Sequence, residues 1–228
     1  RPEIIEQILD KIRAVEAVAL LDHSSDSDHN RSVVTFAGPP EDVLEAAYQA
    51  IAAAAQLIDL NQHSGEHPRI GATDVVPLVP LKGINTAECA ELAKQLAERV
   101  AAELNLPVYL YEAAAATPER KNLAWLRRGQ YEGLKEEIKS DPLRKPDYGP
   151  AELGSAGAVV IGARAPLVAF NVYLNSGDVE IARQVARSIR HLSGGFRFVK
   201  AMGMLVDGRA QVSMNLTNYT KTPLHRVV

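Results

Sequence analysis

Apolar residues recur at two different spacings along the 228-residue chain, and these spacings predict a mixture of helices and strands. Spacing of three and four residues predicts amphipathic helices, while short β-branched and apolar runs between polar loops predict strands. The expected helices cover residues 4–12, 39–60, 86–104 and 178–191. The expected strands cover residues 18–22, 32–37, 75–81, 107–111, 158–161, 167–174, 196–206 and 210–216.

Local signals refine these boundaries. Asn85 followed by Glu88 predicts a capped helix start. Asp207-Gly208, between two apolar runs, predicts a hairpin turn. Pro77 lacks the N–H group that a central strand needs, so its strand is expected at a sheet edge or a bend.

The order of the elements predicts an α+β fold. The first half runs helix, strand, strand, helix, strand, and the second half runs strand, helix, strand, strand. Both orders fit incomplete β-α-β-β-α-β units, so we expect two ferredoxin-like subdomains packed around a cleft, covering residues 1–163 and 164–228. Residues 117–148 interrupt the pattern with helical fragments that still carry apolar side chains, which predicts a connector or an active-site cover.

Composition narrows the classes of function. The chain is 46% hydrophobic and 23% charged, as ordinary globular proteins are, and its net charge of −3 gives no attraction to nucleic acid or to an anionic membrane. The single cysteine, Cys89, excludes an intramolecular disulfide framework, and the longest apolar run, Ala50–Ala55, is too short to span a bilayer. No signal peptide is visible, although the sequence starts at Arg1 without methionine, so a leader could precede it. We expect a cytoplasmic protein.

The densest group of chemically active residues lies at positions 63–74. A neutral imidazole takes up and returns a proton near neutral pH, and of the two histidines there His67 has the better fixed backbone because Pro68 follows it. The spacing of His63 and His67 fits a helical zinc site only if the segment is helical, and Gly65 and Pro68 oppose that. We therefore expect acid–base chemistry and no metal. The residues singled out in this segment are His67, Arg69, Glu66 and Asp74.

Two further segments carry candidate binding residues. Residues 22–31 begin like a calcium loop, but Arg31 stands where glycine is needed, so calcium is rejected, and Ser24–Asp28 is expected to be a hydrophilic hairpin connection. Asn30 and Arg31 adjoin a strand and are expected to face a ligand. The loop Gly149–Gly157 lacks the spacing of nucleotide-binding loops and either approaches a flat ring or simply turns. Arg127-Arg128 is expected to be solvated surface.

Several separated motifs closely resemble those of glutamate formimidoyltransferases, which are also called formiminotransferases and in animals are fused to a cyclodeaminase. The resemblance covers nearly the whole chain. The residues that carry it are His67–Asp74, Asp28–Val33, Pro107–Tyr111, Gly162–Arg164, Ala169–Asn171 and Gln211–Leu216.

This resemblance implies transfer of a formimino group from N-formimino-L-glutamate to N5 of tetrahydrofolate, which serves as co-substrate. It implies that His67 is the catalytic base and that the Gly149–Gly157 loop contacts folate, although Leu153–Ala156 departs from the animal enzymes. Arg69, Arg31 and Arg164 are expected to hold carboxylates, and Glu66 or Asp74 to face the amidinium. The complete set of expected binding residues is Asn30, Arg31, Gly149, Pro150, Gly154, Gly157, Arg164 and Asn171.

Two other functions stay open at this point: a folate-dependent glutamate formyltransferase and a non-catalytic folate-binding module. Members of the family begin with a strand carrying Asn-Phe-Ser-Glu-Gly and continue beyond the position of Val228, which agrees with two incomplete subdomains. The cyclodeaminase region is absent, so no deaminase activity is expected. We expect a homodimer that binds formiminoglutamate and folate, with or without a polyglutamate tail, and neither nucleic acid nor a membrane.

Overall fold

The computed structural model describes residues 1–228, which form two compact units, Arg1–Arg164 and Ala165–Val228. Helices and strands occur in both units, which confirms the α+β class. The ferredoxin-like arrangement and its cleft stay predictions.

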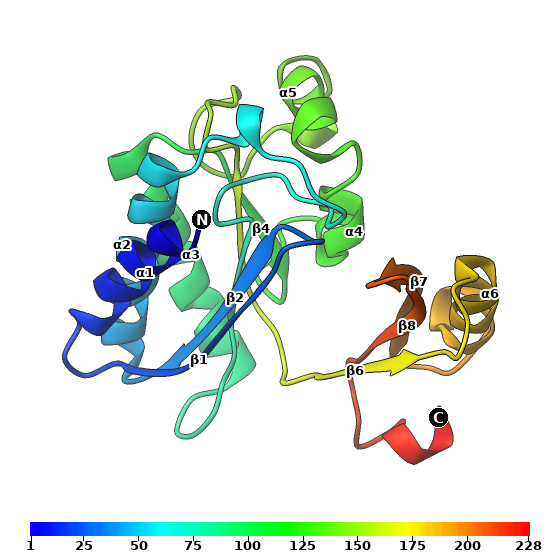
Figure 1. Ribbon diagram of the computed structural model, residues 1–228. Helices are drawn as coiled ribbons and strands as arrows, with labels where there is room; N and C mark the ends of the chain where they lie inside the picture. Colours follow the sequence, from blue (N-terminus) through cyan, green and yellow to red (C-terminus); the bar gives the residue numbers. More distant parts are fainter. The chain divides into compact units, whose positions relative to one another are not determined.

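The first unit contains an antiparallel hairpin, β1–β2, and a parallel three-stranded sheet in the order β3-β5-β4 (Figure 1). The strand that contains Pro77 lies at an edge of its sheet, as predicted. The bounds are α1 Pro2–Arg13, β1 Ala19–Asp26, β2 Arg31–Ala37, α2 Pro40–Leu57, β3 Val75–Leu78, α3 Thr86–Leu104, β4 Val108–Glu112, α4 Leu123–Leu126, α5 Gln130–Ser140 and β5 Val159–Ala163. Short 3-10 helices cover Leu60–Gln62, Glu119–Lys121 and Pro142–Arg144.

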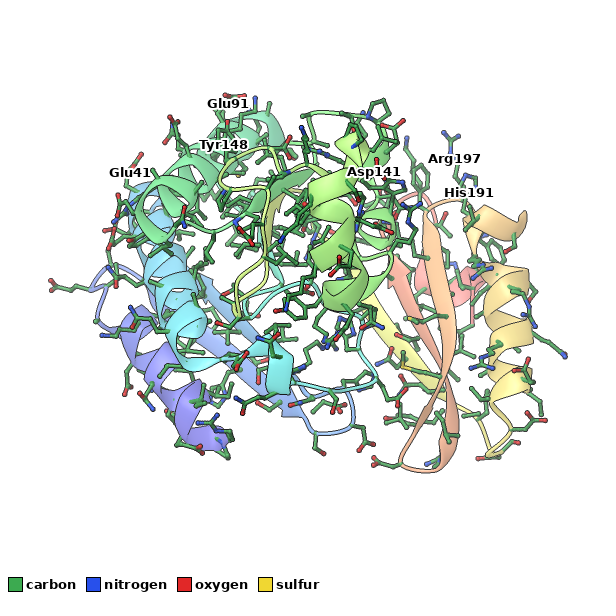
Figure 2. The ribbon with its side chains drawn as sticks, turned by 90° about the horizontal axis from the view of Figure 1, so that it is seen from above. Glu41, Glu91, Asp141, Tyr148, His191 and Arg197 are labelled. Carbon is green, nitrogen blue, oxygen red and sulfur yellow. The ribbon has the colours of Figure 1, made fainter.

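The parallel sheet is buried on both faces. Successive side chains of a strand point to opposite faces, so Val108 and Leu110 pack with α2 and α3, while Tyr109 and Tyr111 pack with α5. Figure 2 shows this division, with Glu41 of α2 and Glu91 of α3 on one side of the sheet and Asp141, at the end of α5, on the other. The segment 117–148 is therefore a packed layer of the first unit.

Two local predictions have clear outcomes here. Asn85 caps α3, and Glu88 returns a hydrogen bond to the backbone of Asn85, which completes the expected capping box. The first strand is longer than expected, because Ser24–Asp26 continue it and pair with Arg31–Val33. The residues of this strand are mostly exposed, so its added part carries no apolar alternation by which its true length could be recognised.

The second unit is an antiparallel sheet in the order β6-β8-β7, and helix α6 lies against β7 and β8 (Figure 1). Asp207 and Gly208 have φ angles of 49° and 71°, so they form the tight hairpin turn that was predicted. Gly203 lets α6 approach the sheet, since a Cβ there would lie 2.3 Å from the backbone nitrogen of Arg183. The bounds are β6 Val168–Tyr173, α6 Val179–Ile189, β7 Val199–Val206 and β8 Arg209–Leu216, with 3-10 turns at His191–Ser193 and Leu224–Arg226.

The loop that precedes β3 is fastened to the chain that enters β5. The N–H of Ala158 donates to the carbonyl oxygen of Ile70 at 2.9 Å, and the N–H of Ala72 donates to that of Ala156 at 2.8 Å. Gly71 lies between these bonds, and a Cβ there would lie 1.8 Å from the oxygen of Ala158. Any side chain at this position would therefore push the loop away from the sheet.

We expect Gly71→Ala to destabilise the first unit by about 1–3 kcal/mol or more, because the added methyl group overpacks rigid backbone. The midpoint of urea unfolding, followed by the fluorescence of Trp125, measures this change, since the only tryptophan packs against the same core as Ile70. Gly133→Ala is the matched control. A Cβ at this α5 position meets nothing within 4 Å, so the substitution should stabilise by about 0.5–1 kcal/mol. An unchanged midpoint in Gly71→Ala would contradict the described contact.

Candidate active site

His67 lies on the irregular loop between Gln62 and β3, where the first unit brings several charged groups together. Its imidazole is partly buried, and Nη1 of Arg31 lies 3.3 Å from Nδ1 and 3.4 Å from Nε2. A guanidinium donates hydrogen bonds and cannot accept them, so it favours the neutral ring, which keeps an acceptor nitrogen. His67 and Arg31 were both predicted site residues, and the structure brings them together.

The surroundings of His67 lower its pKa from 6.5 to about 3. Burial is the largest cause, because it disfavours the charged imidazolium, and the positive charges of Arg31, then Arg127, then His29 act in the same direction. The ligand-free imidazole is therefore neutral at physiological pH. A neutral imidazole has the lone pair that a proton acceptor requires.

His29 lies behind this imidazole and was not among the predicted site residues. It is 8% exposed, and its ring meets the ring of His67 edge to face, with 6.2 Å between centroids. Its Nδ1 lies 3.0 Å from Oδ2 of Asp26, although the two atoms are not aligned for a hydrogen bond. The N–H of His29 donates to Oδ1 of Asp26 and lowers the pKa of that carboxyl group.

The turn at residues 28–31 is clasped to residues 63–66 by backbone and side-chain contacts. Nδ2 of Asn30 donates to the oxygen of Ser64 at 2.7 Å, and Nε2 of His63 lies 3.0 Å from the oxygen of Asn30. Gly65 fits closely against this turn, since a Cβ there would lie 2.5 Å from the oxygen of His29. The amide of Asn30, expected to face a ligand, is thus engaged by the protein itself.

Arg69 is buried, and protein groups accept from all its N–H directions. Nη1 donates to Gln130 at 3.0 Å and to Glu132 at 2.8 Å, while Nη2 donates to Glu132 at 2.7 Å and to the oxygen of His63 at 3.0 Å. Nε donates to Nδ1 of His63 at 3.4 Å, which assigns the proton of that ring to Nε2. The structure therefore leaves Arg69 no donor for the carboxylate clamp that the sequence suggested.

Asp74 is also paired within the protein. Oδ1 accepts from the N–H of Ile70 at 2.8 Å, and Oδ2 accepts two bonds from Arg127, one of them from Nε at 3.0 Å. Arg127 was expected to be solvated surface, yet its side chain is only 17% exposed. That expectation is wrong, because the sequence does not show that the segment 117–148 packs onto this loop. Asp74 does not present a free carboxylate for an amidinium.

The other expected residues have different environments. Glu66 is exposed, and its N–H donates to the oxygen of Asp28. Arg164 lies next to Tyr111, whose pKa is raised to about 12 by burial, an effect that the Arg164 charge partly opposes. Asn171 lies exposed on β6 of the second unit, opposite Ser213. The structure places Glu66 in the loop that carries His67.

The backbone conformation explains why glycine occupies the first and last positions of the Gly149–Gly157 loop. Gly149 has φ 83° and Gly157 has φ 70°, and a Cβ at either position would lie 2.2 Å from a carbonyl oxygen, that of Leu106 or that of Ile70. Close approach within the protein therefore requires both glycines, whether or not a ligand binds. Pro150 and Gly154 instead line a surface hollow of about 640 Å³ between this loop and the ends of α2 and α3.

The structure contains no group of three or more His, Cys, Asp or Glu side chains placed to hold a metal ion. None of its helices has the length and apolar character needed to cross a membrane. The site combines the neutral imidazole of His67, the exposed guanidinium of Arg31 and two ion pairs that join the loop of His67 to the segment 117–148. A neutral imidazole beside an exposed cation is an arrangement that can accept a proton next to an anionic ligand.

Comparison with known proteins shows the family to which the chain belongs. Residues 1–164 match the formiminotransferase domain, N-terminal subdomain, and residues 169–228 match the formiminotransferase domain. The chain therefore belongs to the formiminotransferase domain family.

Curated relatives carry names that agree with this family. The chain is 46% identical over 226 residues to a glutamate formimidoyltransferase of Streptococcus pyogenes, covering 98% of this chain and 75% of the relative. It is 47% identical to one of Thermoplasma acidophilum, covering 97% and 74%. It is 42% identical to a formimidoyltransferase-cyclodeaminase of Mus musculus, covering 99% of this chain and 43% of the relative.

We expect nuclear magnetic resonance titration to find the His67 ring neutral down to about pH 5, well below the range where free histidine titrates. The neutral ring stabilises the fold fully above pH 6.5, and this contribution is lost as pH falls toward about 3. Arg31→Ala should raise the pKa of His67 without fully restoring 6.5, because burial remains the larger cause. A wild-type pKa near that of free histidine would contradict the described environment.

Proposed function

We propose that this chain transfers the formimino group from N-formimino-L-glutamate to N5 of tetrahydrofolate, giving 5-formiminotetrahydrofolate and L-glutamate. Its relatives named glutamate formimidoyltransferase and its membership of the family support the reaction. The observation that carries the choice of base is the neutral imidazole of His67 on an open loop beside an exposed arginine. Tetrahydrofolate is a co-substrate here, and the mechanism uses no metal.

The reaction is a transfer between two amine nitrogens. N5 of the folate attacks the formimino carbon, and His67 accepts the proton that N5 loses as the new C–N bond forms. The tetrahedral intermediate then breaks its bond to the glutamate nitrogen, and the imidazolium of His67 returns the proton to that leaving nitrogen. Each proton removed is replaced, so one residue serves as base and then as acid.

A base with a pKa of about 3 is weak, and the charges beside His67 indicate how substrate strengthens it. Arg31 is exposed and reaches its ring at 3.3 Å, so the carboxylates of formiminoglutamate compete for its guanidinium. Neutralising that positive charge and drawing Arg31 from the ring both raise the pKa of the imidazole. Substrate binding thereby prepares the base.

The remaining expected residues take revised roles in this proposal. Glu66 is the better candidate to face the amidinium, because Asp74 is occupied by Arg127. Arg69 positions the loop and does not hold substrate. Folate contacts are assigned, as the family resemblance implies, to the Gly149–Gly157 loop, while Arg164 and Asn171 stay candidate binding residues.

We expect His67→Gln to lower kcat by about 10²–10⁴-fold while the fold stays intact, because the proton acceptor is lost. Formation of 5-formiminotetrahydrofolate is followed by absorbance, and His23→Gln, an exposed histidine of β1, is the matched control with unchanged kcat. Near wild-type turnover in His67→Gln would remove His67 from the mechanism.

The same assay with formylglutamate in place of formiminoglutamate separates the two donors. Transfer from formiminoglutamate supports the proposal, and transfer from formylglutamate alone would replace it with a formyltransferase. Tight folate binding with neither product would indicate a binding module.

We expect Arg31→Gln to raise KM for formiminoglutamate about ten- to hundredfold, the range for loss of a hydrogen bond to a charged group. The acid limb of kcat/KM should move to higher pH, because loss of the Arg31 charge raises the pKa of His67 in the free enzyme. Steady-state kinetics across pH measure both effects. Arg128→Gln, exposed on the cover, is the control. An unchanged KM in Arg31→Gln would contradict substrate binding by Arg31.

A further inference from the structure

We propose that Arg127 and Glu132, two residues of the cover segment 117–148, are positioning residues that fix the orientation of His67 for the transfer. This inference rests on the proposed function, because it assigns the cover a part in the same site. The two residues do not contact the ring of His67 by any hydrogen bond in the structure. They act on the loop that carries it, at positions two and seven residues after His67.

The first pair joins Arg69 of the loop to Glu132 in the first turn of α5. Both carboxylate oxygens of Glu132 accept, one from Nη1 at 2.8 Å and one from Nη2 at 2.7 Å. Two parallel hydrogen bonds fix the guanidinium plane as well as its distance. Arg69 lowers the pKa of Glu132, so the carboxylate is ionised and the pair is charge-assisted. This pair therefore attaches the backbone that follows Pro68 to α5.

The second pair joins Asp74 of the loop to Arg127, which follows α4. Nε and Nη2 of Arg127 both donate to Oδ2 of Asp74, while Oδ1 accepts from the N–H of Ile70. One carboxylate thus closes the turn at residues 70–74 and ties it to the cover. Asp74 has φ 27°, a strained backbone conformation that surrounding contacts must maintain.

The charges of the two pairs are reversed, since the loop supplies the cation in one pair and the anion in the other. The cover therefore contributes one positive and one negative charge to the two pairs, and the charge of Arg127 also lowers the pKa of His67. Both carboxylates are engaged on the protein, so neither neutralises the imidazolium that forms during transfer. The two ion pairs therefore fix both the position of the loop and the arrangement of charges around it.

The cover is packed into the core of the first unit and can therefore serve as a support. Tyr131, Leu134 and Ile138 of α5 are buried in the same core as Ile70, and the hydroxyl of Tyr131 donates to the oxygen of Gly154 at 3.2 Å. Catalytic groups carried by loops need such a frame, because a displacement of about 1 Å can cost 10²-fold in rate. The proposed frame is the cover together with its two ion pairs.

Glu132→Gln and Arg127→Lys test this proposal. The first removes the carboxylate of one pair, and the second keeps the charge near His67 but loses the two-pronged geometry. We expect kcat to fall about tenfold or more in each variant, with KM for formiminoglutamate within about twofold of wild type. In the resonance titration, Glu132→Gln should raise the pKa of His67, because the loosened loop admits water.

Glu136→Gln and Arg128→Lys are the matched controls, since both side chains lie on exposed surface of the same segment. They should leave kcat and the His67 titration unchanged. Urea unfolding followed by Trp125 fluorescence gives the folded fraction used to correct each rate. If Glu132→Gln does not fold, Glu132→Asp replaces it, because the shorter side chain keeps the charge and loses the fit.

A lower unfolding midpoint with unchanged kcat per folded molecule and an unchanged His67 titration would overturn the proposal, because it would show a structural role alone. A rise in KM with kcat unchanged would overturn it as well and would place the two residues in substrate binding. If the wild-type chain transfers no group, the proposed function fails, and the titration of His67 still reports whether the cover orients the ring.

Discussion

The approach of two backbone segments, residues 70–72 and 156–158, is the contact on which the rest of the site depends. It needs glycine at both Gly71 and Gly157, where a Cβ would lie 1.8 Å and 2.2 Å from carbonyl oxygens of the facing segment. Two backbone hydrogen bonds close the contact, and they fix the irregular loop on the end of a buried parallel strand. His67 is thus carried by a loop with a rigid base, and the ion pairs of the cover act on a loop that is already placed.

The second constraint is electrostatic. A partly buried imidazole among Arg31, Arg127 and His29 is held neutral, so it is ready to accept a proton but weak as a base. Under the proposed function this balance changes when the anionic substrate approaches, because Arg31 is exposed while the charge of Arg127 is engaged with Asp74. In this proposal, the charge of the substrate is coupled to the strength of the base through the Arg31 side chain.

The chain belongs to the formiminotransferase domain family and spans only part of the length of its relatives. The chain spans about three quarters of the length of its glutamate formimidoyltransferase relatives and 43% of a mouse formimidoyltransferase-cyclodeaminase. Within that length, the first unit holds the loop of His67, the turn of Arg31 and the cover. The acid–base chemistry proposed here therefore uses residues of one compact unit.

The sequence by itself determined most of the elements, the α+β class, the capping box at Asn85 and the hairpin turn at Asp207-Gly208, and it singled out the segment around His67 as the candidate site. These features depend on local spacing and on the few residue types that fit a given backbone geometry. Only the tertiary structure decided which charges are free. The sequence suggested that Arg69 and Asp74 are available to a ligand and that Arg127 is solvated surface. The structure instead pairs Arg69 with Glu132 and Asp74 with Arg127. Ion pairs between residues more than fifty positions apart leave no periodic or local signal in the sequence. The position of His29 beside His67 could not be predicted either, because it depends on contacts between residues 28–31 and residues 63–66, which are far apart in the sequence.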